Sequence, residues 1–323
     1  MQTHKNYCAL LIVLLICSCF SDKESMIAKS DNHEKIVLAN TPCISTSENR
    51  NIQPQPYSRR GGSGSYWEVS DLFEFIAFLD DTSIRSLMFY AGTFSDLNPL
   101  VVLMELEKLE ISMNPNIWDI SPLSSLTNLR TLRLFNSGRE KSIEPISLLI
   151  NLQYLDLTFQ DMFFRELLPL QQLEVLKLSN RTSLDVTYIA QLHSLRELEI
   201  TPGRARGETN ATIINIEKLG ELVNLERLMI NGTSMIDISW ITSMQNLKRL
   251  ELRHTSINDI SPLLELLNLI DLCLHQSQIR DLTPLLESRS IKKISGPILE
   301  NGYELTQLFR ERGIEFTSFI YDR

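Results

Sequence analysis

The organisation of this chain is set by one stretch, which reads Leu247-Lys-Arg-Leu250-Glu-Leu252-Arg-His-Thr255-Ser-Ile257-Asn-Asp259-Ile260-Ser-Pro262-Leu263. Leucines at alternate positions put Leu250 and Leu252 on one face of an extended strand. The charged residues between and beside them then point to the other face. The stretch therefore predicts a short strand with one apolar and one charged face.

The same L-x-x-L-x-L pattern recurs along most of the chain. Its first aliphatic position returns every 21 to 23 residues, except for one interval of 30 residues. The ten first positions are Ile84, Leu106, Leu129, Leu152, Leu173, Leu195, Leu225, Leu247, Leu269 and Ile291. Repetition at a fixed period of this length predicts a solenoid, in which each unit stacks only on its neighbours.

The second half of the unit is also repeated, as Trp118-Asp-Ile-Ser-Pro-Leu123, Ile236-Asp-Ile-Ser-Trp-Ile241 and Arg280-Asp-Leu-Thr-Pro-Leu285. These units resemble the leucine-rich-repeat family, specifically the short repeat shared by bacterial internalins and the regulatory subunits of some eukaryotic phosphatases. The resemblance covers Ile84 to about Ser295. It implies an α/β solenoid, a horseshoe with parallel strands on its concave face, a compact return segment in each unit and helical caps.

One position departs from the family pattern. The family usually has Asn at the ninth position of the unit, where its amide satisfies the backbone of a turn. Here Asn occurs there only as Asn114, and hydroxyl residues stand at Ser137, Thr233, Thr255 and Ser277. A hydroxyl makes fewer hydrogen bonds than an amide. We therefore expect a looser internal ladder of hydrogen bonds.

Both ends of a solenoid need a cover, because an open end would expose the apolar core. Residues 66–83 predict an N-terminal helical cap, which begins at Ser70 or Asp71. The repeats occupy residues 84–295. Residues 296–323 predict a C-terminal cap, with a helix that ends at Gly313 and a closing strand after it.

The amino terminus reads as a targeting segment. The apolar run from Tyr7 to Phe20 has 14 residues, whereas a helix needs about 20 to cross a bilayer. The end of the run, Ile16-Cys17-Ser18-Cys19, resembles the lipobox of bacterial lipoproteins. The resemblance implies a signal peptide over 1–18, a lipid on Cys19 and a place at the cell envelope. Phe20 after that cysteine favours the outer membrane or the cell surface over the inner membrane.

Residues 19–65 are polar and end in a Gly-Ser run, so they predict a flexible tether.

The composition of the chain excludes some classes of function. The chain has 31 Lys and Arg against 40 Asp and Glu, a formal net charge of −9, which argues against nucleic acid as a main partner. No phosphate-binding glycine loop and no hydrolase or metalloprotease motif occurs. We expect no enzymatic activity, no cofactor and no small-molecule substrate.

One cluster has a chemical alternative. Cys273 and His275 lie two residues apart on one predicted strand, with Asp271 nearby and His254 on the strand before. Alternate residues on a strand are about 7 Å apart, a distance that a zinc ion can bridge. The other reading is an exposed thiol beside two surface imidazoles, with no bound metal.

The outward positions of the strands predict a binding surface on the concave face. Its N-terminal half is expected to be aromatic and its C-terminal half charged. The candidate residues are Met88, Tyr90, Phe135, Tyr154, Phe159, Arg227, Arg249, Glu251, Arg253, Asp271 and His275. Exposed aromatic residues are typical of interfaces, although these rings could instead pack on each other or on the tether. The 30-residue interval adds a loop with Arg204 and Arg206, either an acidic-partner contact or a tolerated insertion.

These observations predict a non-enzymatic protein-protein interaction module, lipid-anchored at the bacterial cell envelope. Its partner would be a protein, and the resemblance to internalins extends this to a host or envelope protein. The alternative follows from the other branch of the resemblance. It is an intracellular regulatory subunit of an enzyme such as a phosphatase, and it requires that the amino terminus is not a cleaved signal.

Overall fold

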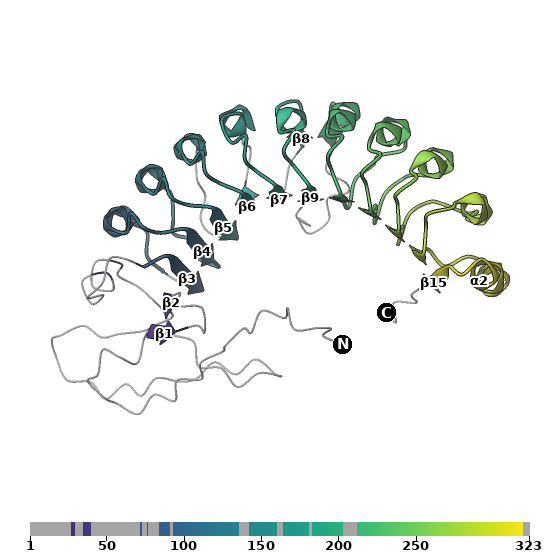
Figure 1. Cartoon of the computed structure of the whole chain (residues 1–323), viewed down its shortest axis with the longest axis horizontal. Coiled ribbons are helices and arrows are strands. Elements are labelled where there is room, and N and C mark those ends of the chain that lie inside the picture. The colour runs from purple at the N-terminus through teal and green to yellow at the C-terminus, as the bar shows by residue number, and fades with distance from the viewer. Residues whose placement is uncertain are drawn as a thin grey trace, which may run out of the picture.

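The computed structural model describes residues 27–29, 35–39, 72, 76, 84–90, 93–135, 142–159, 164–180, 183–202 and 212–318. Cys19, Arg204 and Arg206 lie outside the described residues, as do the side chains of Tyr90 and Phe159. The repeats form an arch with strands along its inner side and helical turns along its outer side (Figure 1). Within the described part of the chain, no helix has the length and apolar character needed to span a membrane.

Parallel strands line the inner side of the arch, one from each unit, and they follow one another in chain order. They are β3 (Ser86–Tyr90), β4 (Lys108–Ser112), β5 (Thr131–Phe135), β6 (Tyr154–Phe159), β7 (Val175–Asn180), β9 (Glu197–Pro202), β11 (Arg227–Ile230), β12 (Arg249–Glu251), β13 (Asp271–Cys273), β14 (Lys293–Gly296) and β15 (Glu315–Ser318). Equivalent residues of successive units are in register, as Leu250 is with Leu228 and Leu272. The predicted horseshoe with parallel strands is confirmed.

The return segments contain short 3₁₀ helices, which lie along the outer side of the arch (Figure 1). They are η2 (Asn98–Val102), η3 (Ser121–Ser125), η4 (Glu144–Leu148), η5 (Phe164–Leu167), η6 (Ile189–Gln191), η7 (Ile216–Glu221), η8 (Ser239–Ser243), η9 (Ser261–Glu265) and η10 (Thr283–Glu287). Proline stands at the first turn of η2, η3, η4, η9 and η10, where its missing N–H costs no hydrogen bond.

Before η3 and η9, the repeated Asp-x-Ser motif places an aspartate two residues ahead of the first residue of the helix. Oδ1 of Asp119 accepts a hydrogen bond from the backbone N–H of Ser121 at 2.8 Å, and its Oδ2 accepts one from the Ser121 hydroxyl at 2.9 Å. Oδ1 of Asp259 accepts both equivalent bonds from Ser261, at 2.9 Å from the backbone N–H and 2.7 Å from the hydroxyl. These hydrogen bonds hold the pKa of both carboxyls below the ordinary value, because they stabilise the charged form.

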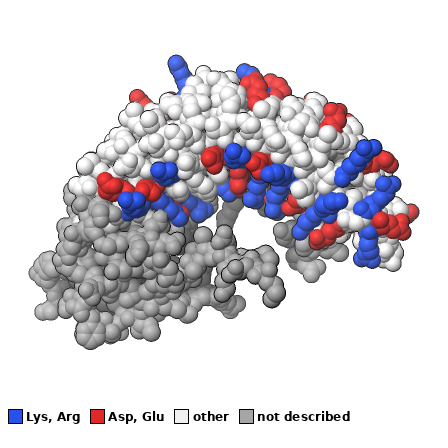
Figure 2. Space-filling view, in the orientation of Figure 1, with Lys and Arg blue, Asp and Glu red and all other residues white. Residues whose placement is uncertain are grey.

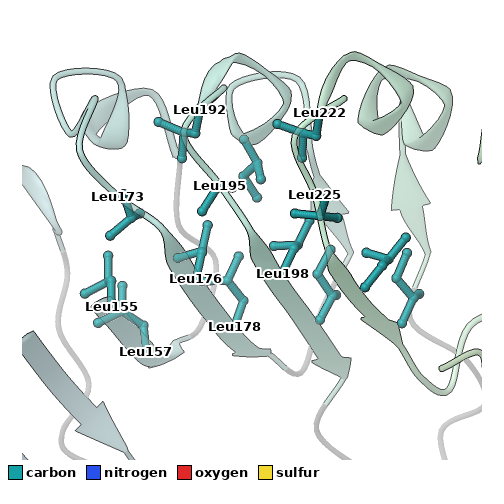
Figure 3. Close-up of a cluster of buried hydrophobic side chains, with 14 of the residues drawn as sticks. Leu155, Leu157, Leu173, Leu176, Leu178, Leu192, Leu195, Leu198, Leu222 and Leu225 are labelled. Carbon is teal, nitrogen blue, oxygen red and sulfur yellow. The ribbon is translucent and has the colours of Figure 1, made fainter. Parts of the chain in front are cut away.

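The core is a continuous column of leucine and isoleucine between the sheet and the return segments. Figure 3 shows part of it, in which Leu155, Leu176 and Leu198 from neighbouring strands stack on one another. All three are fully buried. Each unit therefore buries its apolar face only against the units on either side, as expected for a solenoid.

In the units whose ninth position the structure describes, this position does not form a ladder between units. Thr255 Oγ1 donates to the carbonyl of Leu252 at 3.3 Å, and Ser277 Oγ to that of Leu274 at 2.8 Å, both within their own unit. Nδ2 of Asn114 is buried without a hydrogen-bond partner. The expected looser hydrogen bonding at this position is thus observed.

A regular ladder runs instead at a position that the sequence analysis did not single out. Asparagine directly before the first leucine of a unit donates its Nδ2 to a turn carbonyl of the preceding unit. The bonds are Asn128 to Met104, Asn151 to Thr127, Asn224 to His193, Asn246 to Val223 and Asn268 to Gln245, at 2.8–3.0 Å. Ser194 and Ser290 make the equivalent bond with a hydroxyl. These bonds tie successive units together.

The C-terminal end is closed by α2 (Gly302–Glu311) and β15. Leu305 and Phe309 of α2 are fully buried against the last unit, and β15 pairs with β14. Gly313, with φ of +71°, ends the helical segment, a conformation that suits glycine. Of the predicted N-terminal cap, only Leu72 and Ile76 are described. Both are helical, Leu72 is buried and Ile76 packs on the core.

The prediction of a flexible tether over 19–65 does not hold for two short segments. β2 (Lys35–Ala39) pairs in parallel with β3, and β1 (Ile27–Lys29) pairs antiparallel with β2. The sequence of β2, Lys-Ile-Val-Leu-Ala, is rich in residues that favour strands. The free backbone edge of β3 is a template for such a segment. The sheet therefore continues beyond the first repeat.

Candidate protein-binding face

Two rows of outward side chains run across the strands of the concave face. The first row follows the first residue of each strand and includes Lys108, Tyr154, Glu197, Arg227, Arg249, Asp271 and Lys293. The second lies two residues further on and includes Met88, Glu110, Arg133, Asp156, Lys177, Glu199 and Glu251. Charged residues thus occupy the face along most of its length.

The expected division into an aromatic half and a charged half is therefore wrong. Several charged residues of the face were not among the predicted candidates. They are Lys108, Glu110, Arg133, Asp156 and Lys177 in the N-terminal half, and Glu197 and Glu199 on β9. The signal was present, because each stands at the same place in its unit as Arg249 or Glu251. The phase of the repeat is enough to find them.

The N-terminal part of the face is a mixed cluster of rings and charges. Arg133 Nε lies 2.8 Å from Asp156 Oδ2. Burial raises the pKa of Asp156 above its ordinary value, against the opposing effect of Arg133 and Lys177. Arg133 also lies over the ring of Phe135 at 5.6 Å, and Lys177 Nζ lies 6.0 Å from the ring centre of Tyr154. Both rings therefore lie within cation–π distance of a positive side chain.

Lysine and arginine connect this cluster to the C-terminal part. Lys177 Nζ lies 2.8 Å from Glu197 and 3.3 Å from Glu199. Glu197 also lies 3.7 Å from Arg227 on the next strand. Because Glu197 is shared by cations from the units on either side, the ion pairs link three successive strands of the face.

The C-terminal part is organised around one buried carboxylate. Glu251 Oε1 accepts hydrogen bonds from Arg249, with 2.9 Å to Nε and 2.7 Å to Nη2. Its Oε2 lies 2.8 Å from Nη2 of Arg253. Arg227 is more distant, with Nη2 3.9 Å from Oε1. Three guanidinium groups from β11, β12 and the exit of β12 thus surround a single acidic side chain.

Two candidate residues need correction. Glu251 is 1% exposed, so it cannot be part of a contact surface; it positions the arginines that cover it. His275 was expected in the charged part of the face. Burial and the nearby positive Arg253 lower the pKa of His275 from its ordinary value, which disfavours the charged imidazolium. Met88, Phe135, Tyr154 and Asp271 are half-buried and reach the surface.

The cluster around Cys273 differs from its description in the sequence analysis. Cys273 is a free thiol, but it is 4% exposed and hence buried. Burial raises its pKa, so the thiolate is disfavoured at neutral pH. His254 lies past the end of β12, in a left-handed turn with φ of +53°. Among the residues that the structure describes, no three His, Cys, Asp or Glu side chains are grouped to hold a metal ion.

One open depression lies before the strands, and another lies at the C-terminal end of the arch. One of about 420 Å³ is lined by residues that precede the strands, among them Glu174, His193 and Arg196. The other, about 300 Å³, lies beside α2 and β15 and includes Arg310 and Phe316.

Comparison with known proteins supports the architecture. No protein-family model matches the chain, and no curated protein does. Among solved structures, the internalin InlF of Listeria monocytogenes matches with a TM-score of 0.54 and 22% identity, over 75% of this chain and 76% of that one. A leucine-rich-repeat protein of Leptospira interrogans matches with a TM-score of 0.51 and 21% identity, over 74% and 69%.

A third match is TLR13, solved in complex with ssRNA13, with a TM-score of 0.52 and 21% identity over 66% of this chain and 33% of that one. All three share the stacked strand-and-turn architecture described above. The fold is a leucine-rich-repeat solenoid. The curvature of such a solenoid creates an extended concave surface.

Proposed function

We propose that this leucine-rich-repeat chain is a non-enzymatic protein-binding module, anchored by a lipid on Cys19 at the bacterial cell envelope. Its partner, a host or envelope protein, binds the concave face. The observation that carries the proposal is the layering of that face, in which half-exposed arginines and aromatic rings lie above buried carboxylates.

The composition of the face supports a role in binding. Arg133, Arg227, Arg249 and Arg253 keep 36–42% of their side-chain surface exposed. Tyr154 lies among them on the sheet. Arginine and tyrosine are enriched in protein interfaces and among residues that contribute most to affinity. The carboxylates and rings beneath hold the guanidinium groups in place, which lowers the entropic cost of binding.

The envelope location is supported by sequence alone. The short apolar run and Ile16-Cys17-Ser18-Cys19 are the features of a lipoprotein signal. The structural similarity to InlF concerns the fold only. Two or more acyl chains on Cys19 would give stable attachment, because each buried methylene contributes about 0.8 kcal/mol.

Site-specific photo-crosslinking in cells tests the binding face. A benzophenone amino acid at Phe135 or Tyr154 is expected to give a discrete crosslinked product. The matched positions are Leu148 and Val223, which are 59% and 48% exposed and lie away from the concave strands. Crosslinks of equal yield at all four positions, or at the control positions alone, would contradict binding through the concave face.

Fatty-acid labelling tests the anchor independently. Label is expected on the wild-type chain and on Cys17→Ser, with residues 1–18 removed, and is expected to be absent from Cys19→Ser. Cys17 is the matched control because it lies two residues away in the same apolar segment. An unlabelled chain that begins at Met1 would refute the anchor and favour the intracellular regulatory subunit.

A further inference from the structure

We infer that the partner docks on this face through an acidic protein segment, which is bound by Arg227, Arg249 and Arg253. These three residues are called the arginine cluster below. The inference rests on the proposed function and specifies the chemistry of the partner. It is argued from the depth, hydrogen bonding and neighbours of the three guanidinium groups.

The charges at the cluster are separated by depth. The carboxylate of Glu251 has 2% of its side-chain surface exposed, whereas Arg227, Arg249 and Arg253 have 36%, 42% and 41%. Glu251 therefore lies beneath the arginines. A partner that enters the hollow of the arch meets the guanidinium groups before it reaches Glu251.

The arginines keep donors for a partner. Each guanidinium has five N–H donors, and Glu251 uses only Nε and Nη2 of Arg249 and Nη2 of Arg253. Arg227 lies 3.7 Å from Glu197 and 3.9 Å from Glu251, beyond hydrogen-bond range. Nη1 of Arg249 lies 3.5 Å from Asp271. Arg253 also interacts with the side chain of Cys273, and its Nε is buried. The donors left for a partner are therefore those of Arg227 and the remaining terminal N–H groups of Arg249 and Arg253.

The flanking acidic residues do not cancel this surface. Glu197 and Asp271 are the neighbouring carboxylates on the face, with 21% and 27% of their side chains exposed. Each is less exposed than the arginine it pairs with. Figure 2, which views the arch from one side, shows Lys and Arg intermingled with Asp and Glu along its inner rim.

The charge of the whole chain helps to orient an acidic segment toward the arginine cluster. With a net charge of −9, most of the protein repels an acidic segment, and the arginine cluster attracts it. Arg227 and Arg249 are paired in register on neighbouring strands, about 5 Å apart. Carboxylates with a similar separation can bind both, each through two parallel hydrogen bonds.

Fluorescence anisotropy with two labelled peptides tests the inference on the purified chain. One peptide alternates Glu and Asp with Gly and Ser, and the other has Gln and Asn in place of Glu and Asp. The test variant is Arg227→Gln/Arg249→Gln/Arg253→Gln. The control variant is Arg130→Gln/Arg280→Gln/Arg289→Gln, which removes the same charge at exposed positions outside the strands.

We expect the acidic peptide to bind the wild type and the control variant, and the neutral peptide to bind neither. The test variant should bind the acidic peptide about ten-fold more weakly or worse. Equal weakening in both variants would overturn the inference, because it would reflect total charge alone. Binding of a sulfated polysaccharide but not of the acidic peptide would overturn the assignment to a protein partner.

The crosslinking experiment separates this inference from the proposed function. If a partner still crosslinks at Phe135 and Tyr154 in the test variant with wild-type yield, the face binds a protein but the arginine cluster does not recognise it. If no partner crosslinks at either position while the acidic peptide binds, the cluster is an anion site and the proposed function fails. Melting of both variants, compared with wild type, verifies that each is folded.

Discussion

Arg249 and Glu251 lie two residues apart on β12, and Nε of the arginine donates a 2.9 Å hydrogen bond to the carboxylate. The same carboxylate lies 2.8 Å from Nη2 of Arg253. A buried acid thus fixes two long cationic side chains that would otherwise lose much of their rotamer freedom on binding. The pairing explains why a charged residue is retained at a buried position of the sheet.

Glu251→Gln should therefore destabilise the fold. The variant leaves three guanidinium groups without their shared counter-charge, and loss of one partner from a buried pair is costly. Because the arginines are partly solvated, we expect a loss of about 1–3 kcal/mol. Denaturant unfolding measures it. Glu315→Gln is the control, since Glu315 is 64% exposed with one partner at 3.9 Å; a similar loss there would contradict the argument.

The asparagine ladder predicts a graded series at Asn246. Asn246→Ala removes the donor to the carbonyl of Val223 and should cost about 1 kcal/mol. Asn246→Ser should cost less, because Ser194 and Ser290 make the equivalent bond with a hydroxyl. Thermal melting of the two variants gives the order. Equal melting of Ala and Ser variants would show that the ladder bond does not stabilise the fold.

Close packing between return segments predicts a sensitive glycine. A Cβ at Gly220 would lie 2.8 Å from the carbonyl oxygen of Trp240 in the next unit. Gly220→Ala should destabilise by about 1–3 kcal/mol, since backbone has to shift. Gly302→Ala, at the start of α2, meets nothing within 4 Å and should be neutral or slightly stabilising. The reverse order of unfolding midpoints would refute this packing.

The aromatic rings of the concave face predict a loss of binding without a loss of stability. Tyr154→Ala with Phe135→Ala should weaken partner binding by about 2 kcal/mol or more. Melting should stay close to wild type, because both rings are half-exposed. Titration with the partner that crosslinking identifies measures the change in affinity, and calorimetry measures the melting temperature. A large fall in melting temperature would place the rings in the core.

The aspartates that stand two residues before a Ser or Thr and accept hydrogen bonds from it predict a loss of stability in acid. Hydrogen bonds from the following residues lower the pKa of Asp119, Asp185, Asp259 and Asp281 in the folded state. A folded pKa below the unfolded value means that stability is present above pH of about 4 and falls as the pH drops through the folded pKa. Asp156, whose pKa is raised, contributes in the opposite direction.

Replacement of the four capping aspartates by Asn keeps the turn hydrogen bond, because the amide oxygen also accepts. The fourfold variant should therefore lose less stability than wild type between about pH 4 and pH 2. Unfolding at a series of pH values gives the comparison. An unchanged slope would show that the caps do not titrate with folding.

The periodicity of leucine was sufficient to predict the solenoid, because burial on one face of each strand is decided by residue type. The charged rows were readable from the same period, yet the depth of Glu251 was not. That depth depends on the three arginines above it, of which Arg249 and Arg253 come from the same unit and Arg227 from the neighbouring one. The strand at Lys35–Ala39 was missed because its partner, the edge of β3, is not visible in its own composition.

The asparagine ladder and the leucine column join each unit only to its neighbours. Because the interfaces between units are arranged in series, the small rotations at successive interfaces add up to the opening of the arch. The distance between its two ends follows from the sum of these rotations. The curvature of the face that carries the ion pairs is therefore set by the sum of these rotations between units.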